Sequence, residues 1–311
     1  SANSSSNVSS LTSGGLKLYD HSSRAETSGH QWNTTLNGGN WDWVILQDQS
    51  QVPGFPRTEQ MWIDSRDGAI VLNDMIDDVG GETMLLMTWG RRDGDSSNTW
   101  IYPDFSTMQD ELEQGYIDYR DNMSDANRSV WLAPAGLAFK YIHDQIVADG
   151  GTPTNSGTLF HDLYSGDGSH PSLSGSYLAA CVLYASISGE DPVGLAHSTS
   201  LSNSRVLELQ QAAAATVFNK TSHLDYPWQT MSQPPPPVND PEINVGVQRS
   251  SDYANIYGLE GSHFLFYNGS SIDIVDVGDG SVIDSEICTS TPRISADRRF
   301  IMCPSYVYEY N

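Results

Sequence analysis

The segment SGDGSHPS, at residues 165–172, places an aspartate and a histidine three positions apart. A carboxylate at this spacing can fold back to accept the Nδ1–H of the imidazole, which fixes the tautomer and leaves Nε2 as a general base. Asp167 and His170 are therefore the first candidates for acid–base chemistry. An ordinary polar loop is the alternative. The pair follows the last strand of an alternating strand–helix pattern and precedes an apolar helix, and this position favours catalysis.

The stretch WDWVILQDQSQVPG, at residues 41–54, supplies a second polar group. Its apolar run stops abruptly at a glutamine-rich segment, as a buried strand does when it ends at the ligand-binding edge of an open α/β sheet. We expect Gln47, Gln49 and Ser50 to project from that edge. A glutamine amide there can donate to a developing oxyanion, a contribution of roughly 3 kcal/mol. The alternative is a hydrogen-bonded strand end with no further role.

A glycine pair, Gly14-Gly15, precedes this stretch in the segment TSGGLKLYDH. Glycine permits a positive φ, so the pair can turn a backbone N–H toward a bound anion, or it can simply form a turn. The pattern alone does not choose between these two interpretations.

Hydrophobic periodicity predicts the elements that must position these residues. Short apolar runs predict strands, and apolar positions at helical spacing predict helices. Strands that alternate with helices form βαβ units with a parallel sheet that is covered on both faces. We therefore expect a flavodoxin-like three-layer α/β sandwich in residues 1–227. The expected strands are 42–47, 83–87, 129–133 and 159–164, and the expected helices are 66–79, 105–121, 137–147, 172–187 and 201–219.

The pattern changes at the four consecutive prolines of residues 234–237, which favour a stiff linker over residues 228–242. In residues 243–311 the hydrophobic period is two, with Asn-Gly and Gly-Asp-Gly turns between short strands. This predicts a small all-β module that resembles one blade of a β-propeller and the start of another. Its two cysteines, Cys288 and Cys303, are candidates for a disulfide, whereas Cys181 is expected to be a buried thiol.

The composition argues against several classes of partner. The net charge is −24 and the pI is near 4.3, whereas a nucleic-acid-binding protein needs a basic face. Anionic membranes are disfavoured for the same reason, and the longest apolar run, 177–188, is too short to span a bilayer. We expect neither a cofactor nor a metal, because no Cys/His cluster is present. The incomplete spacing of Asp93, Asp95 and Asn98 predicts a solvated loop rather than a Ca²⁺ site.

Sequons for N-glycosylation favour an extracellular or cell-surface location. The chain contains seven, more than its Ser and Thr content explains by chance. The amino-terminal segment SANSSSNVSS has no signal-peptide pattern, so we expect either a removed leader or an internal piece of a longer protein. The sequons begin at Asn3, Asn7, Asn33, Asn122, Asn127, Asn219 and Asn268.

Taken together, the polar segments resemble the SGNH (GDSL-like) hydrolase superfamily, in a branch with a Gly-Gly-x-x-L-x-x-H segment and the motif WDxVxLQxQS. The matching segments span about residues 13 to 194, in the order of that branch. The carboxyl-terminal segment is the most specific and the glycine pair the least. The segments are GGLKLYDH, WDWVILQDQS, MTWGRRDG, APAGLAF and DGSHPSLSGSYLAACVLYASISGEDPVG.

This resemblance implies a role for each candidate residue. Asp167 and His170 would be the acid and base of a catalytic triad. Gly15 would supply a backbone donor to the oxyanion. Gln49 would take the place of the superfamily's asparagine donor, with Gln47 beside it.

Two further residues enter only through the resemblance. Thr88 and Trp89 follow the expected strand 83–87 and would line the pocket. A core or rim position explains the tryptophan equally well.

The nucleophilic serine is the point at which this chain departs from the superfamily. That serine should follow an earlier strand, and the 13 residues before Gly14 contain no such strand. The chain is then a fragment whose first strand is absent or supplied in trans, a protein that binds without cutting, or an enzyme that uses Ser50. The sequence QDQSQ around Ser50 is similar to the Gly-Gln-Ser-Asn turn of carbohydrate acetylesterases in the same superfamily.

The sequence therefore predicts an ester hydrolase with a Ser-His-Asp mechanism. The expected substrate is an acyl ester, such as an acetyl ester, of a carbohydrate outside the cell. The competing hypothesis is a non-catalytic extracellular binding or surface-structural protein whose β module mediates assembly. The missing nucleophile strand favours the second hypothesis, and the Asp167–His170 segment favours the first.

Overall fold

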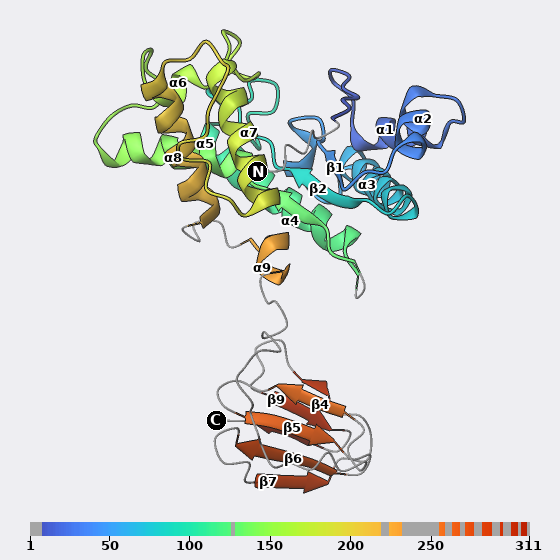
Figure 1. The fold of residues 1–311 in the computed structure, drawn as a ribbon. Helices are drawn as coiled ribbons and strands as arrows, with labels where there is room; N and C mark the ends of the chain where they lie inside the picture. Colours follow the sequence, from blue (N-terminus) through green and yellow to red (C-terminus); the bar gives the residue numbers. More distant parts are fainter. Residues whose placement is uncertain are drawn as a thin grey trace. The chain divides into compact units, whose positions relative to one another are not determined.

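The computed structural model describes residues 8–125, 128–218 and 224–231, together with strands between residues 255 and 309. The chain divides into two compact units, Ser1–Gln233 and Pro234–Asn311 (Figure 1). Helix α9, Pro227–Met231, occupies the first part of the predicted linker at 228–242, and the rest of that linker lies outside the described residues. All the candidate site residues belong to the first unit.

A parallel sheet of three strands forms the centre of the first unit. Its strands follow one another in chain order: β1 Trp43–Leu46, β2 Glu82–Leu86 and β3 Trp131–Ala133. In the register of the sheet, Ile45 pairs with Met84, and Met84 pairs with Trp131. Met84 and Leu85 point to opposite faces of the sheet and both are fully buried, so helices cover both faces. The predicted three-layer α/β class with a parallel sheet is therefore confirmed.

The helices predicted from periodicity are all present, and two more precede the sheet (Figure 1). Among the described helices, none is long and apolar enough to cross a membrane. In chain order the helices of this part are α1 Leu18–Glu26, α2 Gln31–Gly38, the short 3₁₀ helix η1 Val52–Gly54, α3 Gln60–Asp78, α4 Phe105–Met123, α5 Ala135–Ala148, α6 Leu159–Asp162, α7 Leu173–Ser188 and α8 Asn203–Phe218.

The predicted strand at 159–164 is wrong, because most of this segment forms helix α6. Its buried apolar residues, Phe160, Leu163 and Tyr164, have helical spacing, and the hydroxyl of Thr158 caps the helix by accepting from the N–H of His161. The extended part is confined to a single bridge between Tyr164 and Pro171. The composition of a short apolar run does not distinguish a helix from a strand.

Helices α1 and α2 lie in a region whose Ser, Asn, Thr and Gly content indicated no element. Leu18, His21 and Ala25 of α1 are nevertheless buried at helical spacing. Helix α1 packs closely on α3 at Gly68, where an added Cβ would lie 2.5 Å from the Cα of Tyr19. A glycine in the middle of α3 therefore permits the two helices to touch.

Two of the sequons fall on described residues, Asn33 in α2 and Asn122 in α4. In each case the side-chain Nδ2 donates 2.7 Å to a backbone carbonyl, that of Ala25 for Asn33 and that of Asp118 for Asn122. The other sequons lie outside the described residues.

The buried carboxylate of Asp48 joins three helices to the sheet at the carboxyl end of β1. The residue is 2% exposed. One of its oxygens accepts from the backbone N–H groups of Leu18 and Gln49, at 3.0 and 2.8 Å. The other accepts from the hydroxyl groups of Ser65 and Tyr119, at 2.8 and 3.0 Å. Because Leu18 begins α1, Ser65 lies in α3 and Tyr119 lies in α4, one side chain fixes all three helices.

Burial raises the pKa of the Asp48 carboxyl to about 6, although its four hydrogen-bond donors act in the opposite direction. An unfolded aspartate has a pKa of about 3.9, so the folded state binds the proton more tightly than the unfolded chain. The stabilising contribution of this proton is therefore fully present below about pH 4 and is lost as the pH rises through about 6, a change of about 3 kcal/mol.

Replacing Asp48 by Asn is expected to remove this pH dependence. The amide keeps the shape of the side chain, can accept from the two backbone N–H groups and can donate to the two hydroxyls. We expect the unfolding free energy of Asp48→Asn, relative to the parent, to rise by up to about 3 kcal/mol between pH 4 and pH 7.5. Urea unfolding at both pH values measures this difference, with the exposed Asp149→Asn as control. Parallel pH curves for Asp48→Asn and the parent would contradict the assignment.

The described elements of the second unit are all strands, as predicted. The likeness to a propeller blade stays a prediction, and the predicted disulfide involves Cys288, which lies outside the described residues. The first antiparallel sheet contains, in spatial order, β4 Asn255–Gly258, β5 His263–Tyr267, β6 Ser271–Asp276 and β7 Val282–Ile287. The second contains β8 Arg293–Ile294, β9 Phe300–Cys303 and β10 Tyr306–Glu309, with β9 in the middle.

Candidate functional site

The Asp167–His170 pair lies in the loop between α6 and α7. Nδ1 of His170 is 2.6 Å from Oδ2 of Asp167. The other carboxylate oxygen accepts three hydrogen bonds of 2.9 Å, from the backbone N–H groups of Ser169 and His170 and from the hydroxyl of Ser165. The side chain of His170 is 80% exposed. The loop thus presents an imidazole to solvent with one ring nitrogen already bound to a carboxylate.

These hydrogen bonds hold the pKa of the Asp167 carboxyl well below its usual range, and the bond from the His170 ring is the largest cause. The carboxylate therefore stays ionised at neutral pH and can only accept hydrogen bonds. An acceptor-only partner requires Nδ1 of His170 to carry a proton, so the lone pair of the neutral ring is on Nε2.

The loop holds its own shape through backbone contacts. The N–H of Ser165 donates to the carbonyl of His170 at 2.8 Å, which brings the two ends of the loop together. Gly168 has a φ of +67°, and an added Cβ would lie 3.1 Å from Nη2 of Arg92. Both the left-handed conformation and the close approach suit glycine at this position.

The loop after β2 is attached to the histidine loop. The backbone N–H of Arg92 donates to the carbonyl of Gly168 at 2.8 Å. Nε1 of Trp89 donates to the carbonyl of Ser169 at 3.2 Å, and the indole stacks on Phe139 with the ring centroids 4.7 Å apart. Trp89 therefore lies against the Asp167–His170 loop, where it supports the backbone of the loop.

Thr88 and Gly15 are placed differently. Thr88 is 2% exposed, and its hydroxyl oxygen accepts from Tyr116 at 3.4 Å, so its side chain faces the interior. Gly15 has a φ of +76° in an exposed turn before α1. The described contacts do not bring either residue against the histidine loop. Their roles in binding stay predictions.

The polar segment after β1 alternates between solvent and interior. Gln47 is exposed, and Gln49 and Ser50 are half-buried. Nε2 of Gln49 donates to Oε1 of Gln51 at 2.8 Å, and the backbone N–H of Gln51 donates back to Oε1 of Gln49 at 2.9 Å. The two glutamines therefore fix one another, and one N–H of the Gln49 amide is left for another acceptor.

Asp95 connects this segment to the loop after β2. The predicted solvated loop is wrong for this residue, which is 1% exposed. Its carboxylate accepts from Nη1 of Arg91 at 2.7 Å, from Nδ2 of Asn98 at 2.7 Å and from the N–H of Ser97 at 3.0 Å. It also accepts from Nε2 of Gln51. The bond to a backbone N–H two residues later is an Asx turn, and the sequence Asp95-Ser96-Ser97 is the local signal that could have indicated it.

The structure thus joins the loops after β1, after β2 and before α7 into one connected set. The bond between Gln51 and Asp95 links the first two loops, and the contacts of Arg92 and Trp89 link the second to the third. Asp167, His170, Trp89 and Gln49 all belong to this set. Within the described residues, the connection between Gln49 and His170 runs through intermediates rather than a direct contact.

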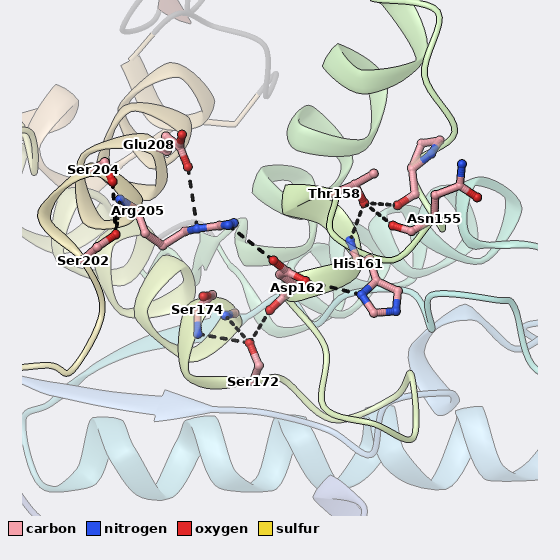
Figure 2. A network of polar contacts seen from close by, with 12 residues as sticks. Asn155, Thr158, His161, Asp162, Ser172, Ser174, Ser202, Ser204, Arg205 and Glu208 are labelled. Atoms are coloured by element: carbon pink, nitrogen blue, oxygen red, sulfur yellow. Dashed lines mark hydrogen bonds and ion pairs between the residues drawn. The ribbon is translucent and has the colours of Figure 1, made fainter.

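A second polar network anchors the carboxyl-terminal side of the histidine loop. Figure 2 shows Asp162 between Arg205 and His161. Nη2 of Arg205 lies 3.3 Å from Oδ2 of Asp162, and Nδ1 of His161 lies 3.4 Å from Oδ1. The Ser172 hydroxyl donates to the carbonyl of Asp162 at 2.6 Å and accepts from the N–H of Ser174 at 3.1 Å (Figure 2). Helices α6, α7 and α8 are therefore tied together two residues after the imidazole.

A hollow that the structure describes lies apart from this set of loops. A shallow hollow of about 390 Å³ is lined by residues from the ends of α7 and α8, and it includes none of the candidate residues. Within the part of the chain that the structure describes, no group of His, Cys, Asp and Glu side chains is arranged to hold a metal ion. The lining residues are Gly189, Asp191, Val193, Gln211, Ala214, Ala215 and Phe218.

Comparison with known proteins bears on the fold alone. No family model and no curated protein matches the chain. The crystal structure of a DUF4886 family protein from Bacteroides uniformis aligns over 68% of this chain and 85% of that chain, with a TM-score of 0.50 and 14% identity. That protein shares the fold. A "putative SGNH hydrolase" from Slackia heliotrinireducens aligns over 55% of this chain and 78% of that chain at 22% identity, but its TM-score of 0.40 is too low to carry an argument.

Removing the Ser172 hydroxyl should loosen the anchor of the histidine loop. Ser172→Ala loses the donor to Asp162 and the acceptor for the first N–H groups of α7. We expect the unfolding free energy to fall by about 1 kcal/mol, the usual effect of losing a helix N-cap. Urea unfolding measures the loss. Ser176→Ala, an exposed position one turn later, is the control and should change stability by less than about 0.5 kcal/mol. Equal stability of the two variants would contradict the capping role.

Proposed function

We propose that the first unit is an ester hydrolase of the SGNH type in which His170 acts as general base. One observation carries this proposal: an ionised carboxylate with four hydrogen bonds holds Nδ1 of an exposed imidazole at 2.6 Å. Such a carboxylate orients the ring and stabilises the imidazolium that forms when Nε2 accepts a proton. His21 is unlike His170 in this respect, because it is buried and packs against Trp32.

In the proposed reaction Ser50 is the nucleophile. Its Oγ attacks the carbonyl carbon of the ester while Nε2 of His170 accepts the hydroxyl proton. The resulting oxyanion is held by the free N–H of Gln49 and by the backbone N–H of Gly15. When the tetrahedral intermediate collapses, the C–O bond breaks and His170 returns the proton to the departing alcohol. A water molecule then cleaves the acyl-serine through the same steps.

Two features support Ser50 over the other serines. It follows β1 at the edge of the sheet where the loop after β2 is also found, and it lies between Gln49 and Gln51, whose side chains are mutually fixed. The turn is also anchored on each side, by Asp48 before it and by Asp95 beyond it. A nucleophile needs this kind of rigid support.

One observation favours the alternative, a protein that binds without cutting. Among the described residues, the hydrogen-bond partner of the His170 ring is Asp167, and no serine hydroxyl reaches its Nε2. In that case the same loops would form a recognition surface, and the second unit would mediate assembly. The two hypotheses make different predictions for His170→Ala: only the hydrolase hypothesis predicts that this variant lowers the rate of ester hydrolysis.

An acyl ester of a carbohydrate is the substrate class we propose. The net charge of −24 disfavours anionic esters. Trp100, in the loop after β2, is 70% exposed and offers a flat apolar face of the kind that stacks on a sugar ring. An extracellular or cell-surface location, with N-glycans on part of the seven sequons, belongs to the same proposal.

Hydrolysis of p-nitrophenyl acetate and of glucose pentaacetate tests the proposal. We expect the parent chain to cleave both esters, and His170→Ala and Ser50→Ala to lower kcat by about 10²- to 10⁴-fold, because each removes a group that moves the proton or forms the acyl bond. His197→Ala is the control, since this ring bonds Thr199 and Asn203 near α8, and it should retain the parent rate.

The other outcomes are equally informative. Activity that disappears with His170→Ala but survives Ser50→Ala would assign the nucleophile to another serine or to water. A parent chain whose rate equals that of His170→Ala would sink the hydrolase proposal. Calorimetric titration with acetylated sugars would then test the binding alternative.

A further inference from the structure

The side chains of Gln49 and Gln51 form a relay between two groups whose hydrogen-bonding direction cannot change. At one end is the carboxylate of Asp95, which can only accept from Nε2 of Gln51. At the other end is the backbone N–H of Gln51, which can only donate to Oε1 of Gln49. Between them, Nε2 of Gln49 donates to Oε1 of Gln51. The orientation of both amides follows from these two ends.

We infer that Asp95 is a positioning residue that sets the orientation of Gln51 in this relay, so that Gln51 accepts from Gln49 and holds the other N–H of Gln49 in place for the oxyanion. This inference rests on the proposed ester hydrolysis, because it assigns the supporting group of the proposed oxyanion donor. A Gln49 amide that is displaced from this position would no longer donate to the developing negative charge, and the barrier would rise.

Asp95 is suited to this role because its carboxylate is buried and remains an acceptor. Burial alone would raise the pKa of Asp95, but the donors on Asn98 and Gln51 and the neighbouring Arg91 lower it overall. The ion pair with Nη1 of Arg91 and the bond from the N–H of Ser97 occupy one oxygen. Gln51 and Asn98 share the other. No rotation of this carboxylate can turn a donor toward Gln51.

An asparagine at this position would break the relay in a defined way. Its oxygen would stay with Arg91 and the N–H of Ser97, which can only donate, so its NH₂ would face Nε2 of Gln51. Gln51 would have to flip, and its nitrogen would then meet the nitrogen of Gln49. Gln49 cannot flip in turn without losing the bond from the backbone N–H of Gln51. The clash between two N–H donors therefore disturbs Gln49, the proposed oxyanion donor.

A second substitution restores the direction of the hydrogen bonds in the relay. In the double variant Asp95→Asn/Gln51→Glu, the NH₂ of the new asparagine donates to one oxygen of the new glutamate, and Gln49 donates to the other. The pair has the same net charge as the parent. Rescue by this exchange would not follow from a merely structural role of Asp95, because the buried ion pair with Arg91 stays broken.

Steady-state kinetics on p-nitrophenyl acetate tests the inference. We expect Asp95→Asn to lower kcat by about tenfold or more with less than about a threefold change in KM, and the double variant to recover to within about threefold of the parent. Asn98→Ala is the matched control, because it removes another donor from the same carboxylate oxygen but leaves the relay intact. It should change kcat by less than about threefold. Circular dichroism verifies that each variant is folded.

Side-chain amide NMR separates a failure of this inference from a failure of the proposed function. We expect the NH₂ signals of Gln49 and Gln51 to shift in Asp95→Asn, and that of Gln49 to return in the double variant. An active parent whose kcat is unchanged by Asp95→Asn, or not recovered by the double variant, overturns the inference and leaves the hydrolase proposal standing. A parent rate that His170→Ala does not change overturns both. Unshifted Gln49 signals in Asp95→Asn also overturn the inference.

Discussion

The burial of one carboxylate at the carboxyl end of β1 is the constraint on which the arrangement of this unit depends. An ionised side chain in the interior is stable only when hydrogen bonds replace the water that it loses. Asp48 obtains four of them, from the start of α1, from its own loop, from α3 and from α4. The alternation of the strand then turns the neighbouring Gln47 outward while Asp48 points inward. The polar end of the strand therefore has an interior half, Asp48, that builds the fold and an outer half, Gln47, that is exposed to solvent.

The parallel arrangement of β1 and β2 explains why loops far apart in the sequence lie close together in space. The carboxyl ends of β1 and β2 lie at the same edge of the sheet, so the loops that follow them meet without any long connection. The third loop joins them largely through its backbone, since the carbonyl groups of Gly168 and Ser169 accept from Arg92 and Trp89. Contacts of this kind hold a loop in place through its backbone, while the side chain of His170 stays exposed to solvent.

The sequence predicted the sheet, the main helices and the Asp167–His170 pair, because each has a local signal: periodicity for the elements and a three-residue spacing for the pair. It failed where the local signal is too short or where the deciding contact lies far away in the sequence. The spacing of Phe160, Leu163 and Tyr164 is too short a pattern to separate a helix from a strand, and α1 owes its burial to α3 rather than to its own polar composition. Asp95 was expected to be solvated because its partner Gln51 is 44 positions away in the sequence.

The exposure of His170 has a consequence for the fate of an acyl group. Enzymes that pass an acyl group to a second alcohol must keep water away from the acyl-enzyme, because water is present at a far higher concentration than any acceptor. An imidazole that is 80% exposed has no such shield in the described part of the chain. In the proposed mechanism, water can reach its Nε2 as readily as a sugar hydroxyl can. The geometry of this loop therefore biases the proposed chemistry toward hydrolysis and away from transacylation.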